Sequence, residues 1–297
     1  MINSTQSPYF TLGAYFDTRL LKYFCFMIVL FIYALIICAN LLLIVVICRN
    51  RSLHEPMYLF LCSLFVNELY GSTGLFPLLL VQILSDVHTV PAPLCFLQIF
   101  CVYSYVSVEF FNLAIISYDR YLAICYPLQY NTCMTFRNVA MLIAVTWLTS
   151  VLMVVGTLSL SSPLQLCGNT IANVYCNNYS IVKLSCSDTR ANNIYGLFIT
   201  AFTVFVPLVL ILYTYIKILR VVQSRFDMNN VPTLLPIFLS LYFITCQPLL
   251  NPVMYGLKMS KILNISQPLL EKLEYQHSSS GTDRCAAGVE KSPFKCL

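Results

Sequence analysis

The chain has 297 residues, of which 59% are hydrophobic and only 10% are charged, and its formal net charge is +5. Soluble globular domains carry about 25% charged residues, so this composition excludes a soluble domain and indicates a helical membrane protein. The modest positive charge contains no dense basic run. It therefore fits the cytoplasmic loops of a membrane protein better than a nucleic-acid-binding surface.

Six segments are long and apolar enough to cross a membrane, for which about 20 predominantly apolar residues are needed. They are residues 23–48, 57–84, 95–126, 139–160, 194–219 and 231–257. The last segment contains four prolines, which would kink a transmembrane helix without preventing a crossing. We therefore predict an all-α, multi-pass bundle in residues 23–257, with an extracellular segment 1–22 and a cytoplasmic, mostly disordered tail 258–297.

The distribution of Lys and Arg over the loops predicts the orientation of the bundle. Arg49 and Arg51 follow the first segment, whereas residues 85–94 after the second segment contain no Lys or Arg. The N-terminus is therefore expected outside. The Asn-X-Ser/Thr sequences at Asn3 and Asn178 lie on the same predicted outer side, as glycosylation requires.

After the fifth segment, the alternation of membrane crossings conflicts with the distribution of charge. Only a short stretch ending at residue 230 separates the fifth segment from the sixth. Simple alternation would place the end of the sixth segment outside, together with Lys258, Lys261 and Lys272. That arrangement opposes the preference of Lys and Arg for the cytoplasmic side. The charges therefore predict that one crossing is missing.

The third segment ends with Asp119-Arg120-Tyr121, an acid–arginine pair at the predicted membrane edge. Charges are costly in hydrocarbon, so such a pair marks a functional site. The surrounding run, residues 117–128, resembles the end of the third helix of vertebrate olfactory receptors, a branch of the rhodopsin-like G-protein-coupled receptors. Five further segments resemble this family in the same order: residues 39–40, 53–61, 185–189, 214–219 and 248–258.

This resemblance covers about residues 20–262. In overall look the chain is most similar to fish olfactory receptors. The resemblance also implies a function. Such a receptor sits in the plasma membrane, binds a small odorant in the outer half of the bundle and activates a stimulatory-type heterotrimeric G protein. It is not an enzyme and needs no cofactor beyond a sodium ion. Residues 226–232 resemble the outer loop before helix seven, so helix six and its inner loop, roughly 30–40 residues, are missing near residues 222–226.

Two other interpretations of the chain stay open. One is a non-signalling truncated receptor or pseudogene product, which is retained in the endoplasmic reticulum or pairs with intact receptors. The other is a six-helix transporter or channel subunit, although neither internal repeats nor a polar pore stripe is visible in the sequence. An enzyme is not expected, because no nucleophile–base pair, phosphate loop or metal-ligand spacing is present.

Four cysteines, Cys95, Cys167, Cys176 and Cys186, lie in predicted outer segments. In an oxidising compartment four cysteines can form two disulfides in three ways, with unpaired thiols as the alternative. The resemblance implies Cys95–Cys176 and Cys167–Cys186. These bonds would hold the second outer loop as a lid.

Two carboxylates, Glu68 and Glu109, lie inside predicted membrane segments, where each must be paired or protonated. The resemblance implies that they face each other and hold a sodium ion, together with Asn40 and Asn251. Oxygen ligands suit such a hard cation. The alternative is a pair of protonated, hydrogen-bonded glutamates without an ion.

The resemblance also implies an inner switch and an outer ligand pocket. In the switch, Asp119 and Arg120 pair at rest and separate when the G protein docks. Its remaining members are Tyr121, Tyr215, Asn251, Pro252 and Tyr255. Helical spacing from Arg120 predicts a mostly apolar pocket with a few hydroxyl groups. Its candidate residues are Val102, Tyr103, Val106, Ser107, Ile199, Thr200, Thr203, Leu241 and Thr245. Trp147 is expected to serve packing alone.

Overall fold

The computed structural model describes residues 9–15 and 21–226, with side chains as far as Val221. Five helices in this part are long and apolar enough to cross a membrane. They are α1 (Leu21–Arg49), α2 (Pro56–Leu84), α3 (Ala92–Cys125), α5 (Phe136–Ser161) and α7 (Arg190–Phe226). They coincide with the first five predicted segments. The sixth predicted segment, 231–257, and the tail 258–297 lie outside the described residues.

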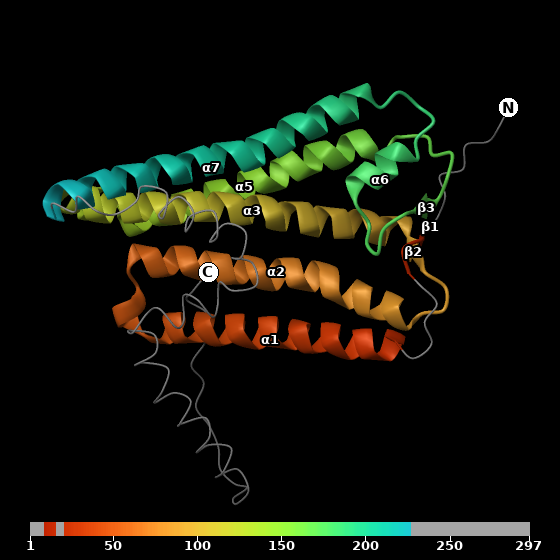
Figure 1. The fold of residues 1–297 in the computed structure, drawn as a ribbon, viewed down its shortest axis with the longest axis horizontal. Helices are drawn as coiled ribbons and strands as arrows, with labels where there is room; N and C mark the ends of the chain where they lie inside the picture. Colours follow the sequence, from red (N-terminus) through yellow and green to blue (C-terminus); the bar gives the residue numbers. More distant parts are fainter. Residues whose placement is uncertain (1–8, 16–20, 227–297) are drawn as a thin grey trace, which may run out of the picture.

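The five long helices lie side by side as a bundle (Figure 1). Helix α1 packs against α2, α2 against α3, and α3 against both α5 and α7, so α3 is the central helix. Large apolar side chains such as Phe31 and Leu197 are exposed on the flanks. In a bundle surrounded by lipid these flanks need no protein partner.

Local sequence explains several helix boundaries. Pro56 occupies the first turn of α2, where its missing N–H costs no hydrogen bond. Thr135 caps α5 by accepting a hydrogen bond from the Asn138 amide at 3.4 Å. Pro77 and Pro207 lie inside α2 and α7, as transmembrane helices tolerate.

Three short helical elements occupy loops for which the sequence predicted no structure. The 3-10 helix η1 (Arg51–Leu53) joins α1 to α2, and α4 (Pro127–Cys133) follows α3 at the end that the sequence predicts to face inside, the inner end. At the opposite, predicted outer end, α6 (Asn178–Lys183) lies in the loop between α5 and α7, the second outer loop. Leu53 is fully buried, so the inner loops close part of the core.

A small β-sheet at the outer end joins three distant parts of the chain. Strand β1 (Tyr9–Leu12) pairs antiparallel with β2 (Thr89–Pro91) and parallel with β3 (Thr170–Ile171). Phe10 and Leu12 on β1 are 1% and 2% exposed and pack in an apolar cluster with the Cys95–Cys176 bridge. The N-terminal segment is therefore a structural part of the outer end.

Tyr15 holds the end of the N-terminal segment in place through two contacts. Its hydroxyl donates to the Val174 carbonyl oxygen at 2.8 Å, and its ring stacks on His88 with 4.4 Å between centroids. Burial raises the pKa of Tyr15 to about 12, so the hydroxyl stays protonated and remains a donor at physiological pH.

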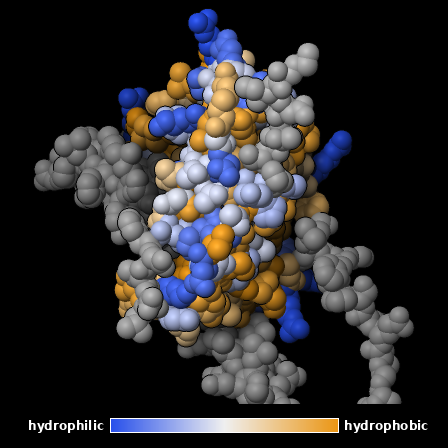
Figure 2. Space-filling model, turned by 90° about the vertical axis from the view of Figure 1, so that its right-hand side faces the viewer, coloured by the Kyte–Doolittle hydropathy of each residue, from blue (hydrophilic) through white to orange (hydrophobic). Residues whose placement is uncertain are grey.

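Viewed onto the outer end, the middle of the molecule carries hydrophilic and neutral side chains, with hydrophobic ones around them (Figure 2).

Candidate functional site

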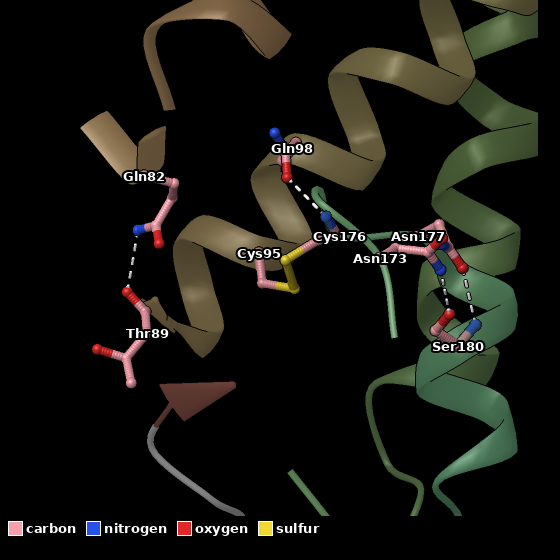
Figure 3. The surroundings of a disulfide bond; sticks show 8 residues. All are labelled: Gln82, Thr89, Cys95, Gln98, Asn173, Cys176, Asn177 and Ser180. Carbon is pink, nitrogen blue, oxygen red and sulfur yellow. Dashed lines mark hydrogen bonds between the residues drawn. A yellow bond between two sulfur atoms is a disulfide. The ribbon is translucent and has the colours of Figure 1, made fainter. Parts of the chain in front are cut away.

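The structure joins the four outer cysteines in the two pairs that the resemblance implies. Cys95 at the start of α3 is bonded to Cys176, with their Cα atoms 5.4 Å apart, and Cys167 is bonded to Cys186, with 5.6 Å between Cα atoms. Gln98 on α3 strengthens the first junction, since its Oε1 accepts the Cys176 amide at 2.8 Å (Figure 3). The second outer loop is thereby tied to the central helix.

The structure describes one of the two predicted glycosylation sites. Asn178 begins α6 and is only 8% exposed, and its buried Oδ1 has no hydrogen-bond partner. Glycosylation of Asn178 stays a prediction. Asn3 lies outside the described residues.

Glu68 on α2 and Glu109 on α3 are 4% and 6% exposed, and both take part in one buried polar network. The Tyr105 hydroxyl donates to Glu68 Oε2 at 3.3 Å, and Asn67 Nδ2 donates to Glu109 Oε2 at 3.3 Å. Asn67 also donates to the Tyr105 carbonyl at 3.0 Å. Neutral side chains thus connect the two carboxyl groups within the bundle.

The network has oxygen atoms that suit a hard cation. Asn67 is fully buried and its Oδ1 has no hydrogen-bond partner. Buried polar atoms normally have partners, so this oxygen in the network of the two carboxyl groups fits a site for sodium. Asn40 Oδ1 on α1 is also buried without a partner, but its amide nitrogen donates to Ile36 of its own helix at 2.8 Å, and no contact joins it to the network. Among the residues that the structure describes, no three His, Cys, Asp or Glu side chains gather to hold a metal ion. Asn251, the remaining candidate, lies outside these residues.

Trp147 on α5 does more than fill space, contrary to the sequence-based expectation. Its indole N–H donates to Ser63 Oγ at 3.2 Å, and Ser63 in turn donates to Asn112 Oδ1 at 3.4 Å. Its ring also contacts Tyr70 edge-on, with 5.8 Å between centroids. A polar chain therefore runs from α5 through α2 to α3.

At the inner end of α3, the carboxyl group of Asp119 is fully buried and bound on both oxygens. Arg120 Nε donates to Oδ2 at 2.9 Å, with a second contact from Nη2 to the same atom. The Tyr130 hydroxyl on α4 donates to Oδ1 at 2.8 Å. The predicted pair is therefore present, and an inner-loop tyrosine completes it.

Of the other predicted switch residues, Tyr121 follows the pair directly in α3 and Tyr215 lies on α7. Tyr121 is near Tyr126 and Tyr213, with ring centroids 5.6 and 6.5 Å apart. Tyr215 on α7 is 37% exposed. Asn251, Pro252 and Tyr255 lie outside the described residues.

The predicted ligand-pocket residues are not all buried inside the bundle, as a shared pocket would require. Ser107 donates to Ser150 Oγ at 3.0 Å and so contacts α5, and Val106 is 40% exposed. Thr203 on α7 is buried, and Tyr103 packs against the outer apolar cluster. Val102 and Ile199 are half-buried and Thr200 is exposed. Leu241 and Thr245 lie outside the described residues, so the pocket stays a prediction.

A cavity of about 590 Å³ opens elsewhere, between α2 and α3. It is lined by α2 side chains from Val66 to Leu78 and by α3 side chains from Leu94 to Cys101, and none of the predicted pocket residues is among them. Leu97 in its wall is 55% exposed on the side of the bundle. The cavity is therefore a lateral groove and is separate from the predicted odorant site.

Three functional candidates escaped the sequence-based reasoning. Asn67 and Tyr105 were missed because polar residues next to Glu68 or one turn before Glu109 carry no spacing signal of their own. Tyr130 was missed because only tertiary structure brings α4 against Asp119. A buried carboxylate needs a donor for each of its oxygens, so the signal for Tyr130 was a hydroxyl-bearing residue soon after Asp119 in the chain.

Comparisons with known proteins agree with the geometry. Residues 39–230 match the model of the 7 transmembrane receptor (rhodopsin family). Human olfactory receptor 51G1 is 31% identical over 82% of this chain and 86% of its own length. Human olfactory receptor 11A1 is 35% identical over 73% of this chain and 68% of its own length, and mouse olfactory receptor 8U3 is 29% identical over 91% and 95%.

Two of these alignments contain more positions than the residues of this chain that they cover. Of the 281 positions aligned with receptor 51G1, this chain fills about 244, or 82% of 297 residues, so about 37 have no counterpart here. With receptor 8U3 it fills about 270 of 304, which leaves about 34. The shorter alignment with 11A1, by contrast, spans 217 positions and about 217 residues of the chain. With its buried Asp119–Arg120 pair and bridged loop after α5, the chain belongs to the olfactory receptors of the rhodopsin-like family of seven-transmembrane receptors.

Proposed function

We propose that this chain is an odorant receptor that binds a small, mostly apolar molecule in the outer half of its bundle and activates a stimulatory-type heterotrimeric G protein. It would act at the plasma membrane with its N-terminus outside. The observation that carries the proposal is the buried Asp119–Arg120 pair at the inner end, which lies beside an exposed apolar surface on α4.

Leu128 is the centre of that surface. It is 97% exposed on α4, and Tyr126 and Phe136, which flank α4, are 46% and 76% exposed. Large apolar side chains grouped at one end of a protein mark contact sites for partners. Arg120 is 37% exposed nearby and supplies the positive charge that a docking partner could draw away from Asp119.

The outer half supports ligand binding through its lid. The two disulfides, the sheet and α6 close the outer end of the bundle over α3. A lid that excludes water favours an apolar ligand underneath. We assign the sodium ion, with Glu68 and Glu109 as its carboxylate ligands, to the buried network in the middle of the bundle.

The substitution Leu128→Ala tests the docking surface. We expect it to lower nucleotide exchange on purified stimulatory-type G protein at least about fivefold, because a hydrophobic anchor contributes about 1 kcal/mol or more. Membranes containing the full chain would be assayed across a panel of volatile small molecules of graded polarity. Leu148→Ala, on the exposed flank of α5, is the matched control. Equal exchange by Leu128→Ala and wild type would remove this surface from the mechanism.

A second candidate function is favoured by the 34 to 37 unmatched positions and by the charge distribution after the fifth helix. In this case the chain lacks helix six, does not signal, remains in the endoplasmic reticulum and pairs with intact receptors. Co-precipitation with an intact olfactory receptor, without surface labelling or a cAMP response, would support it. A ligand-dependent cAMP rise from the chain alone would exclude it.

A further inference from the structure

The lateral groove between α2 and α3 opens on the side of the bundle, towards its outer end. It holds about 590 Å³ between α2 side chains from Val66 to Leu78 and α3 side chains from Leu94 to Cys101. Leu94 and Leu97 in its wall are 40% and 55% exposed, and both helices are long and apolar enough to cross a membrane. Membrane lipids are therefore the molecules that meet this opening.

The length of the groove matches one leaflet of a bilayer. Val66 and Leu78 are twelve residues apart, which corresponds to about 18 Å of helix. Half of the hydrocarbon core of a bilayer is about 15 Å thick. Leu78 lies six residues before the end of α2, and Gln98 lies six residues after the start of α3. A molecule that lies lengthwise in the groove therefore belongs to the outer leaflet, with Gln98 near its outer end.

The wall of the groove selects against a charged lipid headgroup. None of the described residues that line the groove is charged. A phosphate group attracts Lys or Arg, and residues 85–94 beside the outer end of the groove contain neither. Lys22 at the outer end of α1 is already bound to Asp86 at 2.9 Å. A sterol carries one neutral hydroxyl group as its polar head, so it suits this wall better than a phospholipid does.

The α2 side of the groove offers little side-chain bulk. Gly74 has no side chain, and a Cβ atom there would lie 2.5 Å from Cys101 Cβ, so α2 and α3 approach closely at this point. Pro77, about one turn further out, adds only a compact ring. A rigid, flat ring system can pack against such a face with little loss of conformational freedom, whereas a flexible acyl chain must be ordered.

Gln98 supplies a polar anchor within this apolar wall. It lines the groove and is only 3% exposed. Its Oε1 accepts the Cys176 amide at 2.8 Å, which fixes the orientation of the side chain and directs its nitrogen away from Cys176 (Figure 3). Within the described ranges, no hydrogen bond is donated by Gln98 Nε2. Its N–H groups can therefore donate to an oxygen atom of a ligand, as buried donors normally do.

We propose that the groove between α2 and α3 binds a membrane sterol. The flat ring system lies against Gly74 and Pro77, and the sterol hydroxyl oxygen accepts from Gln98 Nε2. This site is separate from the proposed odorant and G-protein functions and does not depend on either. Because the same Gln98 amide holds Cys176, a bound sterol also stabilises the junction between the second outer loop and α3.

The first test uses the full chain in phosphatidylcholine nanodiscs, with a photoreactive cholesterol analogue as the probe. The labelled peptides should contain residues 66–78 and 94–101, and cholesterol should compete for them. Leu97→Trp fills the opening and is expected to lower this labelling at least about tenfold, as overpacking does. Leu97 is largely exposed, so the fold is retained. Leu148→Trp, at a 60% exposed position on α5, is the matched control and should be labelled like wild type.

A second test needs no variant, because it compares cholesterol with its mirror image. The two enantiomers affect a bilayer in nearly the same way, whereas a protein site distinguishes them. Cholesterol is expected to raise the Tm of the wild-type chain by about 2–4 °C more than its mirror image does. Equal Tm gains from the two enantiomers, or undiminished labelling of Leu97→Trp, would overturn the sterol site.

The role of Gln98 is tested with cholestene, which lacks the hydroxyl group. In the wild-type chain cholestene should compete at least about fivefold less well than cholesterol, as expected for the loss of one hydrogen bond. In Gln98→Met the two sterols should compete equally, even if the variant is less stable. Equal competition in the wild type would remove Gln98 from the site. Labelling of the groove by a photoreactive phosphatidylcholine chain that cholesterol does not displace would overturn the proposal in favour of a phospholipid.

Discussion

Buried polar side chains are the residues through which single substitutions should act most specifically on this bundle. Glu68, Glu109 and Asn67 are all less than 7% exposed, in a region where hydrocarbon surrounds the protein. A polar group in such a place must find a partner, so each contact constrains its neighbours. Changes here should alter ion response or coupling before they alter the fold.

Glu109→Gln is expected to abolish stabilisation by sodium. A ligand that binds only the folded state at a hundredfold excess over its Kd stabilises by about 2.7 kcal/mol, and this gain disappears when a carboxylate ligand becomes neutral. The measurement compares Tm of the purified chain in sodium chloride and in choline chloride. Glu55→Gln, in the inner loop, should respond to sodium like wild type. An undiminished sodium response in Glu109→Gln would instead favour two protonated glutamates without an ion.

Single residues were predictable from the sequence where a charge lies in an apolar run. Glu68, Glu109 and the Asp119–Arg120 pair stand out for this reason, because charge in a membrane segment is rare. Their partners were not predictable. The Tyr105 hydroxyl and the Asn67 amide are ordinary residues until the packing of α2 on α3 brings them to the carboxyl groups.

At the scale of elements, close approach between helices depends on small residues. Gly156 on α5 lies against Tyr195 of α7, and a Cβ atom at this position would be only 2.3 Å from the tyrosine hydroxyl oxygen. The hydroxyl also donates to the Met153 carbonyl at 3.3 Å, which keeps it in place. The spacing of α5 and α7 is therefore set at this glycine.

Gly156→Ala should destabilise the bundle by about 1–3 kcal/mol, because an added methyl group in a tight contact forces the helices apart. The cost should shrink in a Tyr195→Phe background, where the obstructing oxygen is absent. Gly196→Ala is the control, since a Cβ atom there meets nothing within 4 Å. Thermal unfolding of the purified variants measures all three effects. An equal cost in both backgrounds would show that Tyr195 is not the obstacle.

The long helices were predictable within four residues, because a run of about 20 apolar residues in a membrane has few alternatives to a helix. The exception is the end of α7, which extends to Phe226 where the sequence predicted residue 219. The short elements were not. Helix α6 and the outer sheet depend on contacts between segments far apart in the chain, and β3 has only two residues, Thr170–Ile171. No local periodicity can reveal such an element.

At the scale of the whole molecule, two independent observations both indicate that this chain is shorter than its relatives by about one crossing. Placement of Lys and Arg predicts a missing crossing after the fifth helix, and two long alignments leave about 34 and 37 positions without a counterpart. One transmembrane helix with its connecting loop has this length. The family assignment holds in either case, whereas the signalling mechanism depends on this segment.

Sequencing the transcript across the codons for Arg220 to Asn230 decides between the two proposed functions. We expect the receptor function to be accompanied by an additional apolar segment of roughly 30–40 residues in the cloned message. A message that joins these codons directly would favour the non-signalling form. Inserting helix six and its inner loop from an intact olfactory receptor at this join should then restore surface expression.

The parallel pairing of β1 with β3 has a consequence for the order of biogenesis. Tyr15 and Val174 are 159 positions apart, so the partner of the N-terminal segment is synthesised roughly 8–30 s later at about 5–20 residues per second. With the N-terminus outside, as proposed, four helices enter the membrane during that interval while Phe10 and Leu12 remain in the lumen without their final neighbours. The outer sheet is thus a late folding step, and a chain stalled before the second outer loop offers these two side chains to lumenal chaperones.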